Sequence, residues 1–555
     1  MAKLSLRLAL ISLAILIAVW AQPAAPETLR RLVDSGVLSD LRWPKFSGYK
    51  ADVAKFYAST GYKLAWVRDR AATPQAQAIV KVLQDAGTKG LDPEDYDGSR
   101  WGARLAGLRA EDDLVRFDLA LTASVMRYAS DVHTGKVNPK VFCFGFDVDG
   151  KRSDLADLLS QRLINAGDAP AALSQLEPPF DGYRRAGKAL LAYQVLAKED
   201  DGELLPDSKK PVEPGDSYPG VARLERLLRR LGDLPPDAKV PPDSHIYEGV
   251  LVDAVKHFQE RHGIDPDGRI GKSTLKQLNV PLSRRVRQLQ IALERWRWIP
   301  DSFVGPAIVV NIPEFRLRAY NHGYQTELEM KVVVGGAFRH QTPVFLNNMQ
   351  YVIFRPYWNV PVSIQKDELL PKLTKDPAYL AKNEYEVVDS HNKVVPGEAV
   401  TPEVLAQLRS RKLSIRQVPG QKNALGFVKF IFPNEYDVYL HGTPMRALFS
   451  RARRDFSHGC IRVEKPEQLA LWVLRDQPRW TLDRIRKAEK GAAPLQVDLN
   501  APIPVLIVYS TAVVKENGEV CFFEDIYGHD TSLDEVLAKG YPYSDWNPPS
   551  GCPRE

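Results

Sequence analysis

Residues 457–462 read SHGCIR, and the stretch that ends with them, residues 441–462, reads HGTPMRALFSRARRDFSHGCIR. A cysteine two positions after a histidine is compatible with a nucleophile and its base, a metal half-site, a redox thiol or a buried structural cysteine. The thiolate is the reactive form, and an ordinary thiol pKa of about 8.5 leaves little of it at neutral pH. An imidazole can take the proton, and His441 and His458 are the two candidates.

The expected strands separate these two histidines. On a strand, His458 and Cys460 would lie on one face about 7 Å apart, which is too far for a relaxed hydrogen bond. His441 ends the run YDVYL (436–440), so a neighbouring strand end could place its ring against the sulfur. Gly459 allows a close backbone approach, and the amides of residues 458–460 could donate to an oxyanion. Thiolate, base and oxyanion donors together indicate acyl transfer at an amide.

The other chemistries have less support in the sequence. A zinc site would need further ligands, and neither a CxxC nor an HExxH partner is present. A redox thiol would need a resolving cysteine, and none lies within 60 residues of Cys460. A buried structural cysteine stays open, since buried thiols are common. We therefore expect no metal ligands and no cofactor.

The N-terminal residues MAKLSLRLALISLAILIAVWAQPAAP indicate export. Lys3 and Arg7 precede an apolar run from Leu8 to Trp20, and Ala21 suits cleavage, which predicts a signal peptide over 1–21. The run is shorter than the roughly 20 residues of a membrane span, although an uncleaved inner-membrane anchor is the alternative. The body of the protein is then periplasmic.

Export matters for the cysteines, which are too few and too scattered for a disulfide framework: Cys143, Cys460, Cys521 and Cys552. A thiol that stays free in an oxidising compartment has a function by expectation. If Cys460 is that thiol, the other three allow at most one bridge. The run VFCFGFDV around Cys143 is more typical of a core than of a site.

Composition indicates a globular multidomain protein. Its 555 residues carry 75 basic and 69 acidic side chains, and the net charge of +6 is spread along the chain. Nucleic acid is therefore not an expected partner. Helical periodicity runs through 28–200, and a polar, proline-rich break at 198–220 marks a domain boundary.

Three short helices are expected over 218–282. VARLERLLRRLG (221–232) and YEGVLVDAVKHFQERHGI (247–264) are amphipathic and end at Gly232 and Gly263. Asp267-Gly268 supplies a turn, and Gly271 tolerates left-handed torsions. Ser273 or Thr274 would cap the third helix. A helical spacer without a ligand is the alternative.

Beyond residue 301 the pattern changes to strands. A hairpin is expected around Asn321-His322-Gly323, with further strands in FLNNMQYVIFRPYW (345–358), GFVKFIFP (426–433) and YDVYLHG (436–442). Residues 362–415 look helical, without β alternation, and could be a cap over a site or a peripheral decoration. IPVLIVYSTAVV (503–514) predicts one more strand, and 516–555 would be a C-terminal tail.

Two resemblances follow from these motifs. AVKHFQERHGIDPDGRIGKSTLKQLN (254–279) resembles the three-helix peptidoglycan-binding module, which implies affinity for the cell wall. HGT followed by SHGCIR, with VVNIPEFRLRAY, QTPVF, YWNVPVSI and PGQKNALGFVKFIFPN, resembles the YkuD-type L,D-transpeptidase catalytic domain. The chain as a whole is similar to the large Gram-negative YcbB-like group. The fold implied is multidomain α+β: a helical N-terminal scaffold, the binding module and a mainly-β catalytic domain over 301–515.

The resemblance implies roles for individual residues. Cys460 would be the nucleophile and His441 the base, with the carbonyl of Gly442 accepting the other ring N–H. The remaining site residues would line the oxyanion side (His458, Gly459), shape the substrate groove (Ser457, Arg462) or lie at the hinge of the capping insertion 362–415 (Tyr357, Trp358). Many members of the large group have SSGC and HDT in place of SHGC and HGT, which leaves the role of His458 open.

The resulting prediction is a periplasmic peptidoglycan L,D-transpeptidase that forms 3→3 cross-links through a cysteine thioester. Its partners would be tetrapeptide donor and acceptor stems and other cell-wall synthesis proteins, and carbapenems should acylate Cys460. The alternatives are an L,D-carboxypeptidase, an inactive wall-binding scaffold and an NlpC-type cysteine peptidase. That peptidase family places its cysteine before its histidine, whereas His441 precedes Cys460 here.

Overall fold

The computed structural model describes residues 25–303, 305–397 and 400–541, and these form two compact units. The expected signal peptide (1–21) and Cys552 lie outside the described residues. No described helix is both long enough and apolar enough to cross a lipid bilayer. Cys460 and Cys521 are free thiols, whereas Cys143 is in a disulfide.

The first unit contains the described residues up to Gln84, Tyr96–Tyr128 and Asp154–Leu173. It is mainly helical: α1 (Ala25–Ser35), α2 (Lys50–Ser59), α3 (Pro74–Gln84), α4 (Trp101–Ala106), most of α5 (Glu111–Thr134), α6 (Leu155–Asp157) and most of α7 (Ala169–Ser174), with a small β1–β2 hairpin (Val67–Arg68, Ala71–Ala72). At its centre, the buried carboxyl of Asp118 accepts hydrogen bonds from the Tyr57 hydroxyl and the Trp66 N–H, both at 2.7 Å. The expected helical N-terminal scaffold is confirmed.

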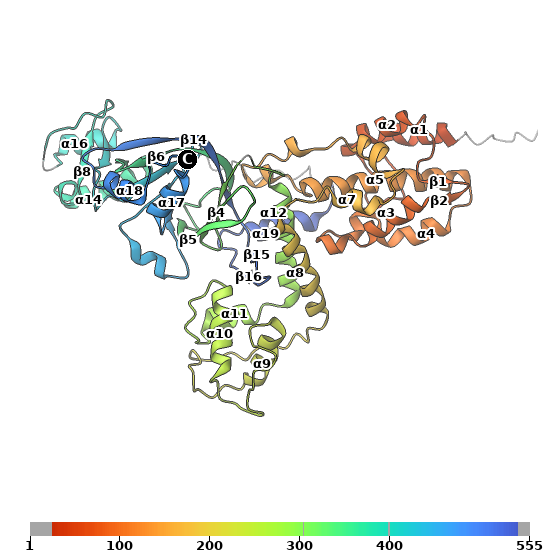
Figure 1. Cartoon of the computed structure of the whole chain (residues 1–555), viewed down its shortest axis with the longest axis horizontal. Helices are drawn as coiled ribbons and strands as arrows, with labels where there is room; N and C mark the ends of the chain where they lie inside the picture. Colours follow the sequence, from red (N-terminus) through yellow and green to blue (C-terminus); the bar gives the residue numbers. More distant parts are fainter. Residues whose placement is uncertain (1–24, 304, 398–399, 542–555) are drawn as a thin grey trace, which may run out of the picture. The chain divides into compact units, whose positions relative to one another are not determined.

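The second unit contains Asp85–Asp95, Ala129–Ser153 and the described residues from Ser174 onward. Its two long helices, α8 (Asp181–Lys198) and α12 (Leu282–Trp298), pack against each other (Figure 1). Although α8 falls within the range 28–200, its buried residues pack with α12 and with the hairpin of β15 (Ala512–Val514) and β16 (Val520–Phe522).

Three helices form the expected module between α8 and α12: α9 (Val221–Leu231), α10 (Val250–Arg261) and α11 (Lys272–Leu278). Gly232 and Gly263 have positive φ after the first two helices, and Gly268 has φ +75° in the turn, as predicted. The predicted cap of α11 is wrong. The helix begins at Lys272 after an extended Gly271, and Thr274 instead accepts a hydrogen bond from the Gln259 amide at 3.1 Å.

One mixed sheet of nine strands forms the body of the region 301–515, which the sequence predicts to be mainly β. Its order is β12-β5-β13-β11-β10-β6-β14-β3-β4, and an additional β4–β5 pairing closes eight of these strands into a ring. The strands are β3 (Ala307–Asn311), β4 (Arg316–Tyr320), β5 (Thr326–Gly335), β6 (Phe345–Phe354), β10 (Val428–Ile431), β11 (Leu440–His441), β12 (Asp455–Ser457), β13 (Ile461–Val463) and β14 (Leu495–Val508). The hairpin expected around residues 321–323 joins β4 to β5. Helices α17 (Pro466–Val473) and α18 (Leu482–Glu489) supply side chains to the same core.

The insertion, residues 362–415, differs from the prediction of a purely helical segment. It contains α13 (Val362–Ile364), the π-helix η8 (Gln365–Leu369), α14 (Leu370–Lys375), α15 (Tyr379–Lys382) and α16 (Pro402–Arg409). It also contributes β8 (Tyr385–Val388) and the start of β9 (Ser414–Gln417), which pair with β7 (Trp358–Asn359) in the order β7-β9-β8. Strands of four residues are too short to establish a period of two, which explains why the sequence pattern missed them.

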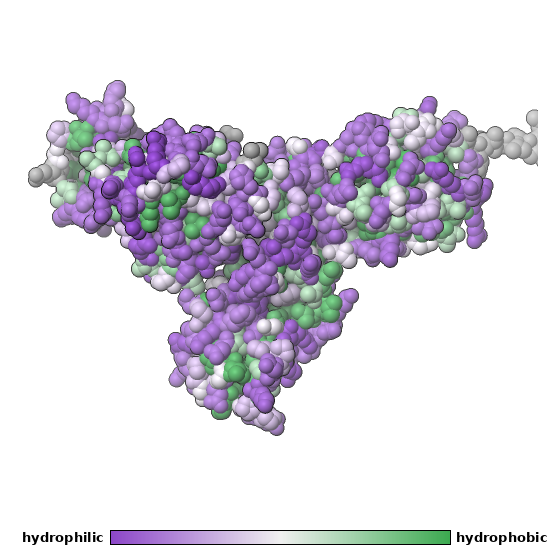
Figure 2. Space-filling view, in the orientation of Figure 1, coloured by the Kyte–Doolittle hydropathy of each residue, from purple (hydrophilic) through white to green (hydrophobic). Residues whose placement is uncertain are grey.

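The expected tail begins with ordered structure that joins the second unit. Besides β16, it contains α19 (His529–Lys539). Asp530 on α19 forms a buried ion pair with Arg295 of α12, and Asp534 pairs with Arg287. Figure 2 shows that hydrophobic residues on the visible face form small separate groups among hydrophilic ones.

Candidate active site

The parallel pairing of β11 and β13 brings the two motif halves together. Leu440 lies opposite Ile461, and His441 lies opposite Arg462. Leu440 and Ile461 are fully buried in the core of the sheet. Because side chains alternate along a strand, His441 and Arg462 project from the opposite face, and Cys460, one residue before β13, enters on that face.

His441 is a buried imidazole with one ring nitrogen already engaged. Its Nδ1 lies 2.6 Å from the carbonyl oxygen of Gly442, so the Nδ1–H donates there, and the Leu425 carbonyl is a second backbone acceptor near the ring. In this tautomer Nε2 carries the lone pair. Burial, together with the nearby charges of Arg462 and Lys429, lowers the pKa of His441 to about 3. The ring is therefore neutral at physiological pH and able to accept a proton at Nε2.

Cys460 is half-buried and free. Burial raises the pKa of its thiol, while the Tyr439 N–H and the Lys429 ammonium act in the opposite direction. Its Sγ lies 3.6 Å from the carbonyl oxygen of Asp437. These pKa directions favour a resting pair of neutral thiol and neutral imidazole. The thiolate, which the sequence reasoning takes as the reactive form, is therefore not the favoured resting state.

Residues 457–460, which we name the cysteine loop, turn between β12 and β13. Gly459 has φ +110°, a region that favours glycine, so His458 and Cys460 do not occupy one strand as the simple pattern assumed. The Ser457 hydroxyl donates to the Cys460 carbonyl at 2.5 Å and accepts the Gly459 N–H at 3.2 Å. Ser457 is buried and shapes the loop rather than an open groove.

These bonds narrow the expected set of oxyanion donors. The Gly459 N–H is used by Ser457, whereas the Cys460 N–H has no hydrogen-bond acceptor among the described residues. Gly459 therefore contributes its backbone conformation, whereas the amides of His458 and Cys460 both lack an acceptor among the described residues. The Cys460 amide belongs to the residue that bears the thiol, so it is the donor that we place at the oxyanion.

His458 points to the insertion. It is exposed, and its Nε2 lies 2.5 Å from a carboxylate oxygen of Glu368 on η8. Its ring also packs against His340, with centroids 4.5 Å apart. His458 thus joins the cysteine loop to the insertion, while His441 carries the buried imidazole.

Arg462 is a half-buried cation on the face of the thiol. Its described hydrogen bond goes to Sδ of Met445 at 3.5 Å, and it has no carboxylate partner among the described residues. Burial lowers the pKa of its guanidinium, and the nearby Cys460 sulfur opposes that effect. An anionic substrate group is a chemically suitable partner for such a cation.

Tyr357 and Trp358 lie at the root of the insertion. Trp358 is in β7 opposite Gln417 of β9, and Arg416 stacks over the Tyr357 ring at 4.3 Å. These contacts are with β9, at the end of the insertion, and do not include Cys460.

Sequence reasoning missed two residues next to the thiol, Lys429 and Tyr439. The Lys429 ammonium lies 3.7 Å from the Tyr439 ring centroid, and Lys429 is paired with His441 across β10 and β11. The sequence held a signal for both residues. Tyr439 is two positions before His441 in YDVYLH, so strand alternation places it on the same face. Lys429 in FVKFI lies opposite His441 on the neighbouring strand, which places it on that face as well.

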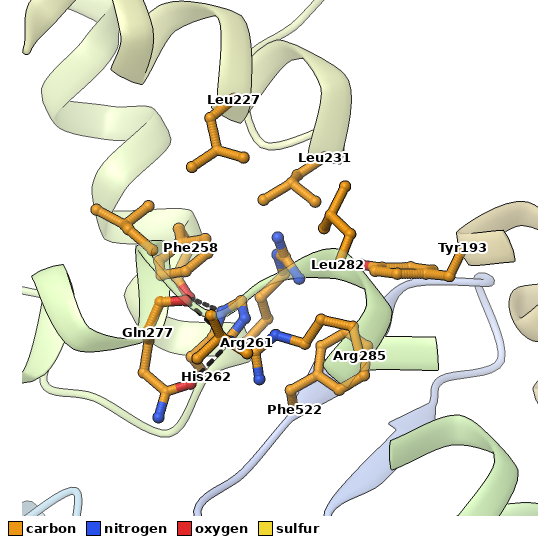
Figure 3. A pocket seen from close by; sticks show the side chains of 12 residues that line it. Tyr193, Leu227, Leu231, Phe258, Arg261, His262, Gln277, Leu282, Arg285 and Phe522 are labelled. Atoms are coloured by element: carbon orange, nitrogen blue, oxygen red, sulfur yellow. Dashed lines mark hydrogen bonds between the residues drawn. The ribbon is translucent and has the colours of Figure 1, made fainter. Parts of the chain in front are cut away.

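A small pocket, with room for little more than a single water molecule, lies elsewhere, where the three-helix module meets α8, α12 and β16 (Figure 3). The His262 ring stacks on Phe258 there, and Arg261 pairs with Asp233. Arg285 donates to oxygens of Gln277, and burial lowers its pKa to about 9. The cavity lining includes no residue of the cysteine loop, so it belongs to the junction of the module.

Comparisons with known families match three segments of the chain. Residues 305–496 match the model described as "L,D-transpeptidase catalytic domain". Residues 51–190 match "Scaffold domain", and residues 217–278 match "Putative peptidoglycan binding domain". The predicted architecture of helical scaffold, binding module and mostly-β catalytic domain is confirmed, and the catalytic match supports an enzyme of the acyltransferase type.

One curated relative, named "Putative L,D-transpeptidase", comes from Haemophilus influenzae (strain ATCC 51907 / DSM 11121 / KW20 / Rd). It is 34% identical over 305 residues, which is 54% of this chain and 60% of the relative. The chain thus spans about 60% of the length of the relative that it matches.

Two solved L,D-transpeptidase structures also align with the chain. That of Xylanimonas cellulosilytica is 14% identical with a TM-score of 0.18, over 55% of this chain and 100% of that one. That of Stackebrandtia nassauensis is 13% identical with a TM-score of 0.21, over 55% and 96%.

Proposed function

We propose that this chain, whose residues 305–496 form an L,D-transpeptidase catalytic domain, transfers acyl groups between peptidoglycan stem peptides through Cys460. The observation that carries the proposal is the arrangement at the ends of β11 and β13. A neutral, buried His441 with Nδ1 held by Gly442 lies on the same sheet face as a free thiol. This arrangement supports acyl transfer by nucleophile and general base.

In the first half-reaction, the Cys460 sulfur attacks the carbonyl carbon of the third residue, a diamino acid, of a tetrapeptide stem. The thiol proton passes to Nε2 of His441, and the carbonyl π electrons move to the oxygen, which the Cys460 N–H stabilises. The C–N bond then breaks, and the departing D-alanine amine takes the proton from His441. A thioester on Cys460 remains.

In the second half-reaction, the side-chain amine of another stem attacks the thioester carbonyl. His441 accepts the amine proton, the C–S bond breaks, and the proton returns to the sulfur. The product is a 3→3 cross-link. Water in place of the amine gives a tripeptide, so the same site would act as an L,D-carboxypeptidase.

The donor end of the stem suggests a partner for Arg462. The D-alanine carboxylate is separated from the attacked carbonyl carbon by the amide nitrogen and one carbon. Arg462 follows Cys460 by two positions on one sheet face, a separation of about 7 Å along the chain. We propose that its guanidinium, which has no described carboxylate partner, binds this terminal carboxylate.

The peptidoglycan-binding match at 217–278 supports wall material as the substrate. Together with the catalytic match, it supports work outside the cytoplasm at the cell wall, in agreement with the predicted export signal.

Product analysis tests the proposal. Purified full-length protein is incubated with tetrapeptide muropeptides, and the products are identified by mass spectrometry. Loss of D-alanine with dimer formation is expected, and Cys460→Ala should abolish both. Release of D-alanine without dimers would assign carboxypeptidase activity, internal stem cleavage would favour a peptidase, and dimers formed by Cys460→Ala would refute the mechanism.

A further inference from the structure

The carbonyl of Gly459 is held by a residue from a distant part of the chain. The Thr342 hydroxyl donates to the Gly459 oxygen at 2.7 Å and accepts the Gly335 N–H at 2.9 Å. Thr342 is 1% exposed, so water does not compete for these bonds. One side chain therefore ties the cysteine loop to the end of β5.

Tyr527 completes this arrangement from beyond the sheet. Its hydroxyl donates to the Gly335 carbonyl at 2.6 Å and accepts the Thr342 N–H at 3.2 Å. Burial raises the pKa of this hydroxyl to about 12, so it keeps its proton and remains a donor. The Tyr527 N–H in turn donates to the Tyr509 hydroxyl, which donates to Asp525.

Peptide geometry connects these bonds to the thiol. The Gly459 carbonyl and the Cys460 N–H belong to one trans peptide unit, so they point in opposite directions. With the carbonyl held by Thr342 on the buried side, the Cys460 N–H is directed away from Thr342. A residue other than glycine would be strained at φ +110°, so the loop reaches this orientation only with glycine there.

We infer that Thr342 and Tyr527 are positioning residues that aim the Cys460 N–H at the oxyanion formed during acyl transfer. The inference rests on the proposed function only in requiring acyl transfer at Cys460, whatever the acyl donor. It also assigns a part in the reaction to Tyr527, which lies outside the matched catalytic segment 305–496.

Two reactions of the Cys460 thiol distinguish a misdirected Cys460 N–H from a general disturbance of the site. Acetylation by p-nitrophenyl acetate passes through an oxyanion: sulfur bonds to the carbonyl carbon, p-nitrophenolate leaves, and the thiol proton is released. Alkylation by iodoacetamide displaces iodide at a saturated carbon and forms no oxyanion. Both rates at Cys460 are measured by peptide mapping on the full-length protein, which also resolves the buried Cys521.

The variants are matched to single bonds. Thr342→Val keeps the shape and removes the hydroxyl, Thr342→Ser keeps the hydroxyl, and Tyr527→Phe removes only the second bond pair. Tyr247→Phe is the control, because that buried hydroxyl also donates to a glycine carbonyl, Gly268 at 2.6 Å, far from the loop in sequence and in a different helical module.

Loss of a complete oxyanion donor costs about 10²–10³-fold, so misdirecting one should lower acetylation by about tenfold or more. We expect this for Thr342→Val with alkylation nearly unchanged, restoration by Thr342→Ser, and a smaller, several-fold loss for Tyr527→Phe. An equal fall in the acetylation and alkylation rates of Thr342→Val would overturn the inference. So would an acetylation rate in Tyr527→Phe that equals the rate in Tyr247→Phe. If Thr342→Val fails to fold, the Tyr527→Phe comparison decides.

These outcomes are independent of the proposed substrate. If the acetylation pattern holds but muropeptides give no product, the positioning role stands and the substrate assignment fails. If muropeptides react but the variants leave acetylation unchanged, the substrate assignment stands and the positioning role fails.

Discussion

The two histidines beside Cys460 lie in contrasting surroundings. His441 is 4% exposed at the end of β11, and its Nδ1 is held by the Gly442 carbonyl. His458 is exposed in the cysteine loop and pairs with Glu368 of the insertion. Because His441 is buried and its Nδ1–H is held, its ring is neutral and Nε2 can accept a proton. Because His458 is exposed and contacts the Glu368 carboxylate, it links the cysteine loop to the insertion instead. Closeness in sequence to the thiol therefore does not identify the base.

The largest expected effect comes from removing the buried imidazole. His441→Gln should lower the rate of acyl transfer by about 10²–10⁴-fold, because general base catalysis contributes about that much. His458→Gln is the matched substitution and should change the rate far less. Rates with muropeptide donors at equal protein concentration make the comparison, and a larger loss for His458→Gln would reverse the assignment of the two residues.

The pH profile tests the same contrast. A neutral His441 is the active form, and its pKa of about 3 means that the form persists well below the ordinary histidine range. We therefore expect kcat/KM to stay nearly constant from about pH 7 down to about pH 4.5, where an unperturbed imidazole near 6.5 would already be protonated. A fall centred near pH 6.5 would show that the base is an exposed histidine. Circular dichroism at each pH checks that the protein remains folded.

Arg462 should affect donor choice more than thiol chemistry. Hydrogen bonds to charged groups contribute about 1.5–3 kcal/mol, so Arg462→Met should raise KM for a tetrapeptide donor by about tenfold or more. A donor whose terminal carboxylate is an amide should bind wild type weakly and lose little more in the variant. Arg446→Met is the control, since exposed Arg446 donates to the Glu464 carbonyl. An equal loss with both donors would exclude carboxylate recognition.

The contact between His458 and Glu368 should give the smallest effect on rate. Exposed ion pairs contribute about 0–1 kcal/mol, so Glu368→Gln should change acyl transfer by less than about fivefold. The same substitution should speed hydrogen exchange in residues 362–375. Glu386→Gln, which breaks the ion pair between Glu386 of the insertion and Arg416 directly after it, is the matched control. If Glu368→Gln leaves hydrogen exchange in residues 362–375 unchanged, His458 does not hold the insertion in place.

Short-range patterns predicted the parts of the fold and site that depend on neighbouring residues. The pair of His441 and Cys460 could be proposed because His441 ends the strand motif YDVYLH and Cys460 precedes the strand that begins at Ile461, and Gly442 follows His441 directly. Gly232 and Gly268 also fulfil the turn and cap roles read from the sequence. The four-residue strands β8 and β9 escaped because so few positions show no clear alternation.

Contacts between distant segments could not be predicted in this way. Thr342 and Gly459 are 117 positions apart, and Tyr527 and Gly335 are 192 apart. The bonds that hold the cysteine loop therefore depend on the pairing of β12 and β13 with β5 and on the packing of the segment around Tyr527. The cap of α11 failed for a related reason, since Thr274 bonds to Gln259 on another helix instead of its own N-terminus. At the start of α11, the local preference of Ser and Thr for capping was overridden by a hydrogen bond to a residue of another helix.

The most direct measurement is the site of the acyl adduct. Full-length protein is mixed briefly with a tetrapeptide stem, quenched in acid, digested and mapped by mass spectrometry. We expect one adduct, the stem without its terminal D-alanine, on the peptide that contains Cys460. It should be absent in Cys460→Ala, formed far more slowly in His441→Gln and little changed in His458→Gln. An adduct on another residue, or cross-linked product from Cys460→Ala, would refute Cys460 as the acyl carrier.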